Sequence, residues 1–159
     1  MDALVVSHPQ ESNQFLTFLL DQQEYGLEIF KIQEIRGYAP VTPIPNLPAH
    51  VRGVMNLRGT VLPVVDLRIR FRLPAVEYGK FTVIVIAMVG EKMVGLLVDA
   101  VSDVLHVEQN AMRPAPDFGN AVDTQFISGV FQSREQLAVA LNLEKLLSDV
   151  ELSVPEAVS

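Results

Sequence analysis

The residues of this chain with the clearest chemical potential gather between positions 52 and 67. Arg58 stands directly before Gly59, which adopts positive φ at little cost, so two short apolar strands can meet there in a tight turn. An arginine at such a turn offers a planar fork of N–H donors that suits the carboxylate of a partner. A hairpin with a solvated arginine is the alternative. Pro63 predicts that the second strand lies at a sheet edge or bulges there.

Patterns typical of catalysis or metal binding are missing from the sequence. The three histidines share no metal-ligand spacing, and the chain has no cysteine. No serine lies in a nucleophile elbow, and no glycine-rich phosphate loop occurs. Asp66, Asp99 and Asp103 stand beside expected strands or helix starts, where capping or solvation explains them. We therefore expect no enzymatic activity, no metal and no cofactor.

The charge balance of the 159-residue chain disfavours one class of partner. Its net charge is −7, from 12 basic and 19 acidic residues, which disfavours sequence-independent binding of nucleic acid. Arg68, Arg70 and Arg72 are expected on the exposed side of a short helix. Residues 1–12 lack the pattern of a signal peptide, and the longest apolar run, residues 83–89, is far shorter than the ~20 residues of a spanning helix. We expect a soluble protein that reaches a membrane only through a partner.

An internal repeat organises the chain. Residues 15–29 align without a gap on residues 84–98, and Gly53 later falls on Gly129. The second copy needs a longer loop, which residues 110–125 supply. Apolar residues make up 49% of the composition, enough for a buried core. We predict a duplicated β module with a pseudo-two-fold relation between its copies.

Each copy of the repeat is expected to contain the same elements. A β-hairpin comes first, and a helical turn or two follows, because Ile29, Ile32 and Ile35 recur at a spacing of three. A proline-rich connector comes next, which cannot be regular helix. The final strands, at residues 61–66 and 136–141, each lead into a short helix. Short strands separated by glycine and proline indicate small barrels.

Several segments of the sequence, taken in order, resemble the CheW family of bacterial chemotaxis coupling proteins. The segments are residues 33–38, 52–67, 98–105 with 113–116, and 142–147. The resemblance extends from about Phe15 to Leu147. It implies a mostly β fold, in which two pseudo-two-fold-related, five-stranded SH3-like barrels share a core and carry short helices.

The same resemblance implies the organisation of the chain. We expect a single CheW-like domain with a flexible tail at each end, because the terminal residues show no apolar pattern. The expected ranges are a tail at residues 1–12, the domain at residues 13–150 with intertwined subdomains at about residues 13–79 and 80–150, and a tail at residues 151–159.

The function implied by the resemblance is that of a chemotaxis adaptor. Members of this family couple the cytoplasmic tips of chemoreceptors, the methyl-accepting chemotaxis proteins, to the regulatory domain of the histidine kinase CheA. The expected location is the cytoplasm, at receptor arrays on the inner face of the membrane. The alternatives are an adaptor of another chemosensory pathway, such as surface motility, a module that binds only one partner, and a small-molecule-binding barrel.

The resemblance also implies which residues bind the receptor. Arg58 and Asn56 match the receptor-binding turn of the family, and Ile32 and Glu34 match a helical turn that faces the same partner. Core packing is the alternative role for Ile32. Glycines that match the family are expected to shape the site without binding a partner. These site-shaping glycines are Gly53, Gly59, Gly95 and Gly129.

Overall fold

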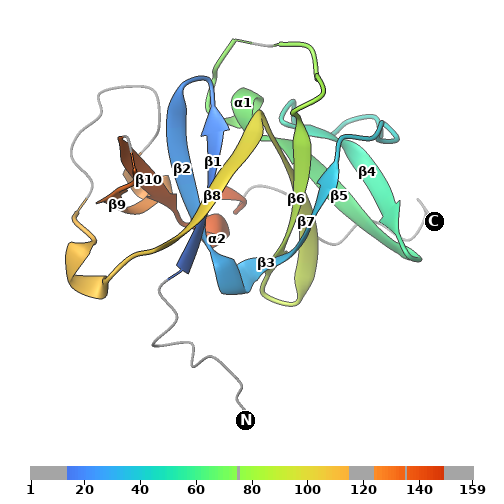
Figure 1. Ribbon diagram of the computed structural model, residues 1–159. Coiled ribbons are helices and arrows are strands. Elements are labelled where there is room, and N and C mark those ends of the chain that lie inside the picture. Colours follow the sequence, from blue (N-terminus) through green and yellow to red (C-terminus); the bar gives the residue numbers. More distant parts are fainter. Residues whose placement is uncertain (1–13, 75, 115–123, 135, 149–159) are drawn as a thin grey trace.

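The computed structural model of the protein describes residues 14–74, 76–114, 124–134 and 136–148 (Figure 1). The expected terminal tails, at residues 1–12 and 151–159, lie outside these ranges.

Within the described residues, ten strands form two five-stranded sheets, which confirms the predicted mostly β fold. Short helical segments connect them. In spatial order, the first sheet contains β8 (Ala100–His106), β1 (Gln14–Leu20), β2 (Gln23–Glu28), β10 (Leu137–Leu141) and β9 (Ile127–Gln132). The second sheet contains β3 (Ile32–Gly37), β6 (Val83–Val89), β7 (Lys92–Val98), β5 (Thr60–Asp66) and β4 (Val51–Leu57). The helical segments are η1 (Ile29–Lys31), α1 (Leu67–Arg70), η2 (Gln109–Ala111), η3 (Thr124–Phe126) and α2 (Leu143–Leu146).

The two sheets are related by the internal repeat. When β1 to β5 are matched in order with β6 to β10, the strand order of the first sheet becomes that of the second. Each sheet nevertheless draws strands from both halves of the chain, because β3, β4 and β5 join β6 and β7, whereas β8, β9 and β10 join β1 and β2. Antiparallel ladders of β1 with β8 and of β3 with β6, and parallel ladders of β2 with β10 and of β5 with β7, make this exchange. The two copies are therefore intertwined.

The predicted helical turns after each hairpin are mostly wrong. Of the two predicted segments, only the first contains a helical turn, η1. Ile32 and Ile35 lie in the strand β3, as Val101 and Val104 lie in β8. The register between β3 and β6 shifts between Ile32 and Glu34. A bulge adds one residue to a strand, so side chains three positions apart, instead of two, can face the same side. Apolar residues at this spacing resemble the pattern of a helix.

The predicted edge position of Pro63 is also wrong, since β5 lies between β4 and β7. Pro63 pairs with Val54 of β4, and the ladder with β7 starts one residue later, at Val64. Proline has no N–H to donate, so it is tolerated where the neighbouring strand makes no ladder bond.

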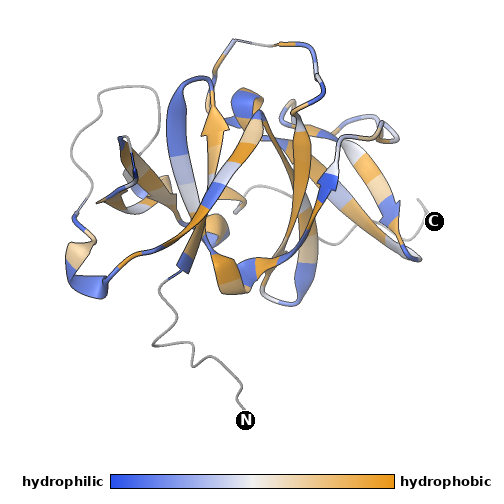
Figure 2. Ribbon diagram, viewed as in Figure 1, coloured by the Kyte–Doolittle hydropathy of each residue, from blue (hydrophilic) through white to orange (hydrophobic). Residues whose placement is uncertain are grey.

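One hydrophobic core joins the two sheets, as predicted. Its buried residues come from both, for example Phe18 of β1 and Val85 of β6. Figure 2 shows hydrophobic residues along β1 and β6 and hydrophilic residues at the turns. Tyr25 stacks on Phe18 and on Phe71, which follows α1, with ring centroids 5.9 Å and 5.5 Å apart. Burial, with a smaller contribution from Asp21, raises the pKa of Tyr25 to about 12.

Arg68 of α1 is buried, so the prediction that it lies on an exposed helix face is wrong. Its guanidinium contacts Asp21 at 2.6 Å and Asp99 at 2.5 Å, and its Nε donates to the carbonyl of Pro74. Asp21 lies in the β1–β2 turn and Asp99 between β7 and β8. These contacts raise the pKa of Arg68, because they outweigh the opposing effect of burial. Arg68 therefore links the β1–β2 turn of the first sheet to α1, which follows β5 of the second sheet.

The N-terminus of α1 confirms the capping role predicted for Asp66. Its Oδ1 accepts hydrogen bonds from the backbone N–H groups of Arg68 and Ile69. Its Oδ2 accepts from the hydroxyl of Tyr78 at 2.6 Å. Among the described residues, no helix is long and apolar enough to cross a membrane.

Candidate functional site

The turn between β4 and β5 has the tight geometry that the sequence predicts. Arg58 and Gly59 form a two-residue loop, with φ of 51° and 90°, between the paired residues Leu57 and Thr60. Positive φ at both loop positions is the mark of a type I′ hairpin turn. The side chain of Asn56 accepts a hydrogen bond from the backbone N–H of Gly59 at 2.8 Å. Asn56 therefore fixes the turn that presents Arg58.

Arg58 and Glu34 meet across a distance of 24 residues in sequence. An Arg58 Nη donates to Glu34 Oε1 at 2.6 Å, and an Arg36 Nη donates to Glu34 Oε2 at 2.9 Å. The hydrogen bonds from Arg58 and then Arg36 lower the pKa of Glu34, and the bond to Glu34 raises the pKa of Arg58. Glu34 thus stays charged and holds two arginines in place.

The Arg58–Glu34 ion pair joins the two ends of the second sheet. Within the described residues no ladder joins β3 to β4, the two end strands. The Arg58 side chain reaches from the β4–β5 turn to Glu34 on β3 and remains 69% exposed. A side-chain contact therefore holds the turn against β3 while leaving the guanidinium accessible.

Ile32, the remaining predicted receptor-binding residue, is less exposed than Arg58. It is half-buried and packs against the main core, which supports its alternative role in core packing. The apolar surface near it comes from Phe30 and Ile35, which are 56% and 43% exposed. Sequence reasoning did not place Arg36 beside Glu34, because it predicted a helical turn for this segment. On a strand, the alternation of residues would have put Arg36 on the same side as Glu34.

The glycines of the site allow close contacts of the backbone. A Cβ on Gly53, whose φ is +150°, would lie 2.1 Å from the carbonyl oxygen of Thr42. Gly129, its counterpart in the repeat, is similarly tight, with a Cβ 2.8 Å from the carbonyl oxygen of Arg113. A Cβ on Gly95 would lie 2.9 Å from a methyl group of Ile84, so packing between strands restricts that position. Gly53 and Gly95 therefore allow close packing in the second sheet, which carries the candidate site, and Gly129 does so in the first sheet.

Within the described residues, no group of three or more histidine, cysteine, aspartate or glutamate side chains could hold a metal ion. The site is instead an exposed arginine on a rigid turn, backed by a carboxylate and a second arginine. Such an arrangement is suited to recognition of a protein partner through a charge-assisted hydrogen bond.

Comparisons with known proteins agree with this architecture. Residues 14–151 match the model of the family described as CheW-like domain. The chain is 41% identical over 146 residues to Chemotaxis protein CheW of Klebsiella aerogenes, covering 92% of this chain and 88% of that protein. It is 37% identical to Probable chemotaxis protein CheW of Rhizobium etli, over 95% and 97% of the two chains.

A more distant relative and a solved structure extend the comparison. Protein FrzA of Myxococcus xanthus is 26% identical over 92% of each chain. The crystal structure of the scaffolding protein TtCheW from Thermoanaerobacter tengcongensis superposes with a TM-score of 0.79 at 31% identity, covering 86% of this chain and 92% of that one. The chain therefore belongs to the CheW-like family.

Proposed function

We propose that this protein is a chemotaxis adaptor that couples the cytoplasmic tips of chemoreceptors to the histidine kinase CheA. The relatives named chemotaxis protein CheW and the solved scaffolding protein support the adaptor role. The observation that carries the receptor contact is Arg58, held 69% exposed on a turn by Asn56 and Glu34. The protein binds its partners without catalysing a reaction, in the cytoplasm, and reaches the membrane through receptors.

The receptor contact uses the guanidinium of Arg58. Within the described residues, this group donates only to Glu34, so other N–H donors remain available for a carboxylate of the receptor. Arg36 shares the charge of Glu34, which leaves the trio with a net positive charge. Phe30 and Ile35 offer exposed apolar surface on the same segment of chain. An acidic side chain is the receptor chemistry that fits this net positive group.

The kinase contact uses other surfaces of both halves. Within the described residues, the end strands β3 and β8 pair on one side only, whereas single bridges from Thr42 and Arg113 reach the outer edges of β4 and β9. Open strand edges accept backbone hydrogen bonds from a partner. The regulatory domain of the kinase is similar to CheW, so two like folds would meet at these edges and adjacent loops.

A second candidate is the same adaptor role in another chemosensory pathway, such as surface motility. The 26% identity to Protein FrzA of Myxococcus xanthus over nearly the whole chain favours it. Receptors and kinases from the two kinds of pathway, tested side by side, would separate the two candidates.

Reconstitution tests the proposal. The protein is mixed with CheA and receptor-bearing membranes, and kinase activity is measured with and without a receptor ligand. We expect control of the kinase by the receptor only when this protein is present. Arg58→Ala should weaken control while the kinase still binds. Equal receptor control with and without the protein would contradict the adaptor role.

A further inference from the structure

The internal repeat places a second arginine–carboxylate pair in the first sheet. β8 is the counterpart of β3, and the β9–β10 connection is the counterpart of the β4–β5 turn. In these places Arg134 Nε contacts Asp103 Oδ2 at 3.1 Å, with side chains 76% and 37% exposed. Asp103 thus corresponds to Glu34, and Arg134 to Arg58.

The balance of charge around this second pair is the reverse of the first. In the second sheet one carboxylate, Glu34, holds two arginines. In the first sheet Arg134 contacts Asp103, and the carboxylate of Glu24 lines the same cleft. Asp21 also lines this cleft, but its carboxylate is paired with Arg68. The alignment of the copies puts Leu105 where β3 carries Arg36. A surface of the same construction therefore has excess negative charge and suits a partner of the opposite sign.

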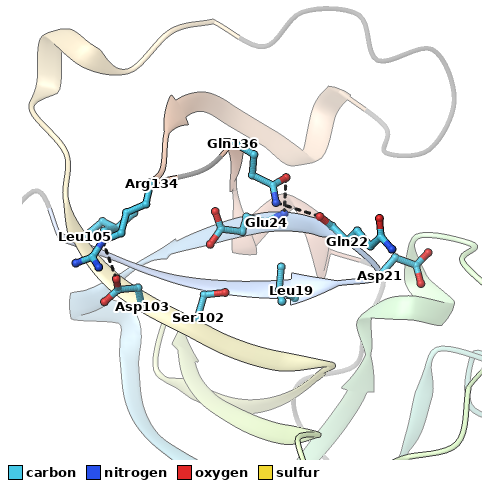
Figure 3. A pocket seen from close by; sticks show the side chains of 9 residues that line it. All are labelled: Leu19, Asp21, Gln22, Glu24, Ser102, Asp103, Leu105, Arg134 and Gln136. Atoms are coloured by element: carbon cyan, nitrogen blue, oxygen red, sulfur yellow. Dashed lines mark hydrogen bonds and ion pairs between the residues drawn. The ribbon is translucent and has the colours of Figure 1, made fainter.

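A cleft of about 440 Å³ lies beside this second pair (Figure 3). Leu19 and Leu105 contribute apolar surface to it. Figure 3 shows the Glu24 carboxylate directed toward the side of the cleft where Arg134 and Asp103 lie. Within the described residues this carboxylate accepts no hydrogen bond and forms no ion pair. An uncommitted, half-buried carboxylate in a cleft of this size is a group available to a ligand.

We infer that this cleft binds a basic side chain, arginine or lysine, presented by an extended segment of a protein partner. The stem of such a side chain would cover Leu19 and Leu105, and its charged end would lie between Glu24 and Asp103. Asp103 already accepts a guanidinium, that of Arg134, so its geometry suits one. β8 ends its sheet, and its open edge beside the cleft can pair with an extended backbone.

The inference goes beyond the proposed adaptor function and does not depend on receptor binding by Arg58. Arg134 would compete with the partner, because its exposed side chain already contacts the Asp103 carboxylate that the basic side chain of the partner needs. Removing Arg134 should therefore strengthen binding. A site that recognised acidic segments through Arg134 would respond in the opposite direction.

The test uses the full chain labelled with ¹⁵N and titrated with the peptide acetyl-Leu-Arg-Leu-amide. Amide shifts should change at Glu24, Asp103 and Gln136. Glu24→Gln should weaken binding by about tenfold, the scale of one charge-assisted hydrogen bond. Glu91→Gln, in the exposed β6–β7 turn of the other sheet, is the matched control and should leave affinity unchanged. Arg134→Ala should increase affinity severalfold.

Two further ligands separate the sources of the basic group. The citrulline version of the peptide lacks the charge and should not bind, and agmatine, a free guanidinium compound, should bind more weakly than the peptide. Equal binding of agmatine would make the cleft a small-molecule site and overturn the inference. So would a lack of shifts at the cleft, insensitivity to Glu24→Gln, or loss of binding in Arg134→Ala.

Discussion

Among the predicted site-shaping glycines, we expect replacement of Gly53 by alanine to lower the free energy of unfolding the most. The backbone at Gly53 has φ +150°, which side-chain-bearing residues rarely adopt. The new Cβ would lie 2.1 Å from the Thr42 oxygen and 2.7 Å from its carbonyl carbon. Because these are backbone atoms, no rotation of a side chain can relieve the clash, and the Thr42 segment must move away from β4.

The expected loss of unfolding free energy follows from the rare backbone conformation and the clash with Thr42. A residue forced into a rare backbone region costs about 1–3 kcal/mol. Moving Thr42 breaks its two backbone hydrogen bonds with Val54, each 2.9 Å long. Each such bond contributes about 0.5–1.5 kcal/mol to folding, so the total loss is about 2–6 kcal/mol. For a domain of this size, that loss lowers the melting temperature by roughly 5–20 °C.

Urea unfolding of matched glycine variants provides the assay. Gly37→Ala is the control, since its Cβ meets nothing within 4 Å and it needs no unusual φ. The Cβ of Gly59→Ala would also meet nothing within 4 Å, but Gly59 has φ +90°. This variant should therefore lose only the free energy that the rare backbone conformation costs. We expect the loss of unfolding free energy to rise from Gly37 to Gly59 to Gly53. A Gly53→Ala protein as stable as Gly37→Ala would refute the reasoning.

The remaining predictions concern charged and titrating groups. Arg58→Ala should lower receptor affinity by about tenfold with an unchanged melting temperature, measured by pull-down and thermal unfolding; a large fall in melting temperature would make Arg58 structural. Glu34 should titrate in NMR below the ordinary range of a glutamate carboxyl, because hydrogen bonds from Arg58 and Arg36 lower its pKa and keep the ion pair until the pH falls through that value, and Arg58→Ala should raise this pKa. Because the pKa of Tyr25 is raised to about 12, its neutral form stabilises the fold below pH ~10, and this contribution of about 2–3 kcal/mol is lost as the pH rises toward 12. An alkaline decline in stability that is equal in Tyr25→Phe would contradict this. Arg68→Met should cost about 2–4 kcal/mol in urea unfolding, less than a fully buried pair because the Asp21 side chain is 47% exposed, and adding Asp99→Asn should recover part of it.

Local features of the site could be predicted from the sequence because neighbouring residues decide them. Glycine after Arg58 permits positive φ, which predicts the hairpin turn, and the turn formed there. Asp66 before a short apolar segment predicts a helix cap, and its side chain accepts the N–H groups of the first turn. The matching positions of Gly53 and Gly129 indicated the repeat, and both make the same close approach to a carbonyl.

Errors in the prediction arose where distant segments decide the structure. The spacing of Ile32 and Ile35 resembles a helix, but pairing with β6 makes the segment a strand with a bulge. Arg68 has the charge of a surface residue, yet two carboxylates from other elements compensate its burial. A charge can be buried only where partners converge on it, and convergence is a property of the folded chain.

The amino-acid sequence is enough to predict the duplicated β module, its turns and caps, and the arginine of the β4–β5 turn. Which strands share a sheet depends on the folded chain, since the two copies exchange strands through antiparallel and parallel ladders that local residues do not specify. The tertiary structure also decided that Glu34 meets Arg58, and that the matching pair of Asp103 and Arg134 lies beside an acidic cleft. The physical reason is that turns and caps depend on residues a few positions apart, whereas strand partners and charge pairs form between segments that only the packed core brings together.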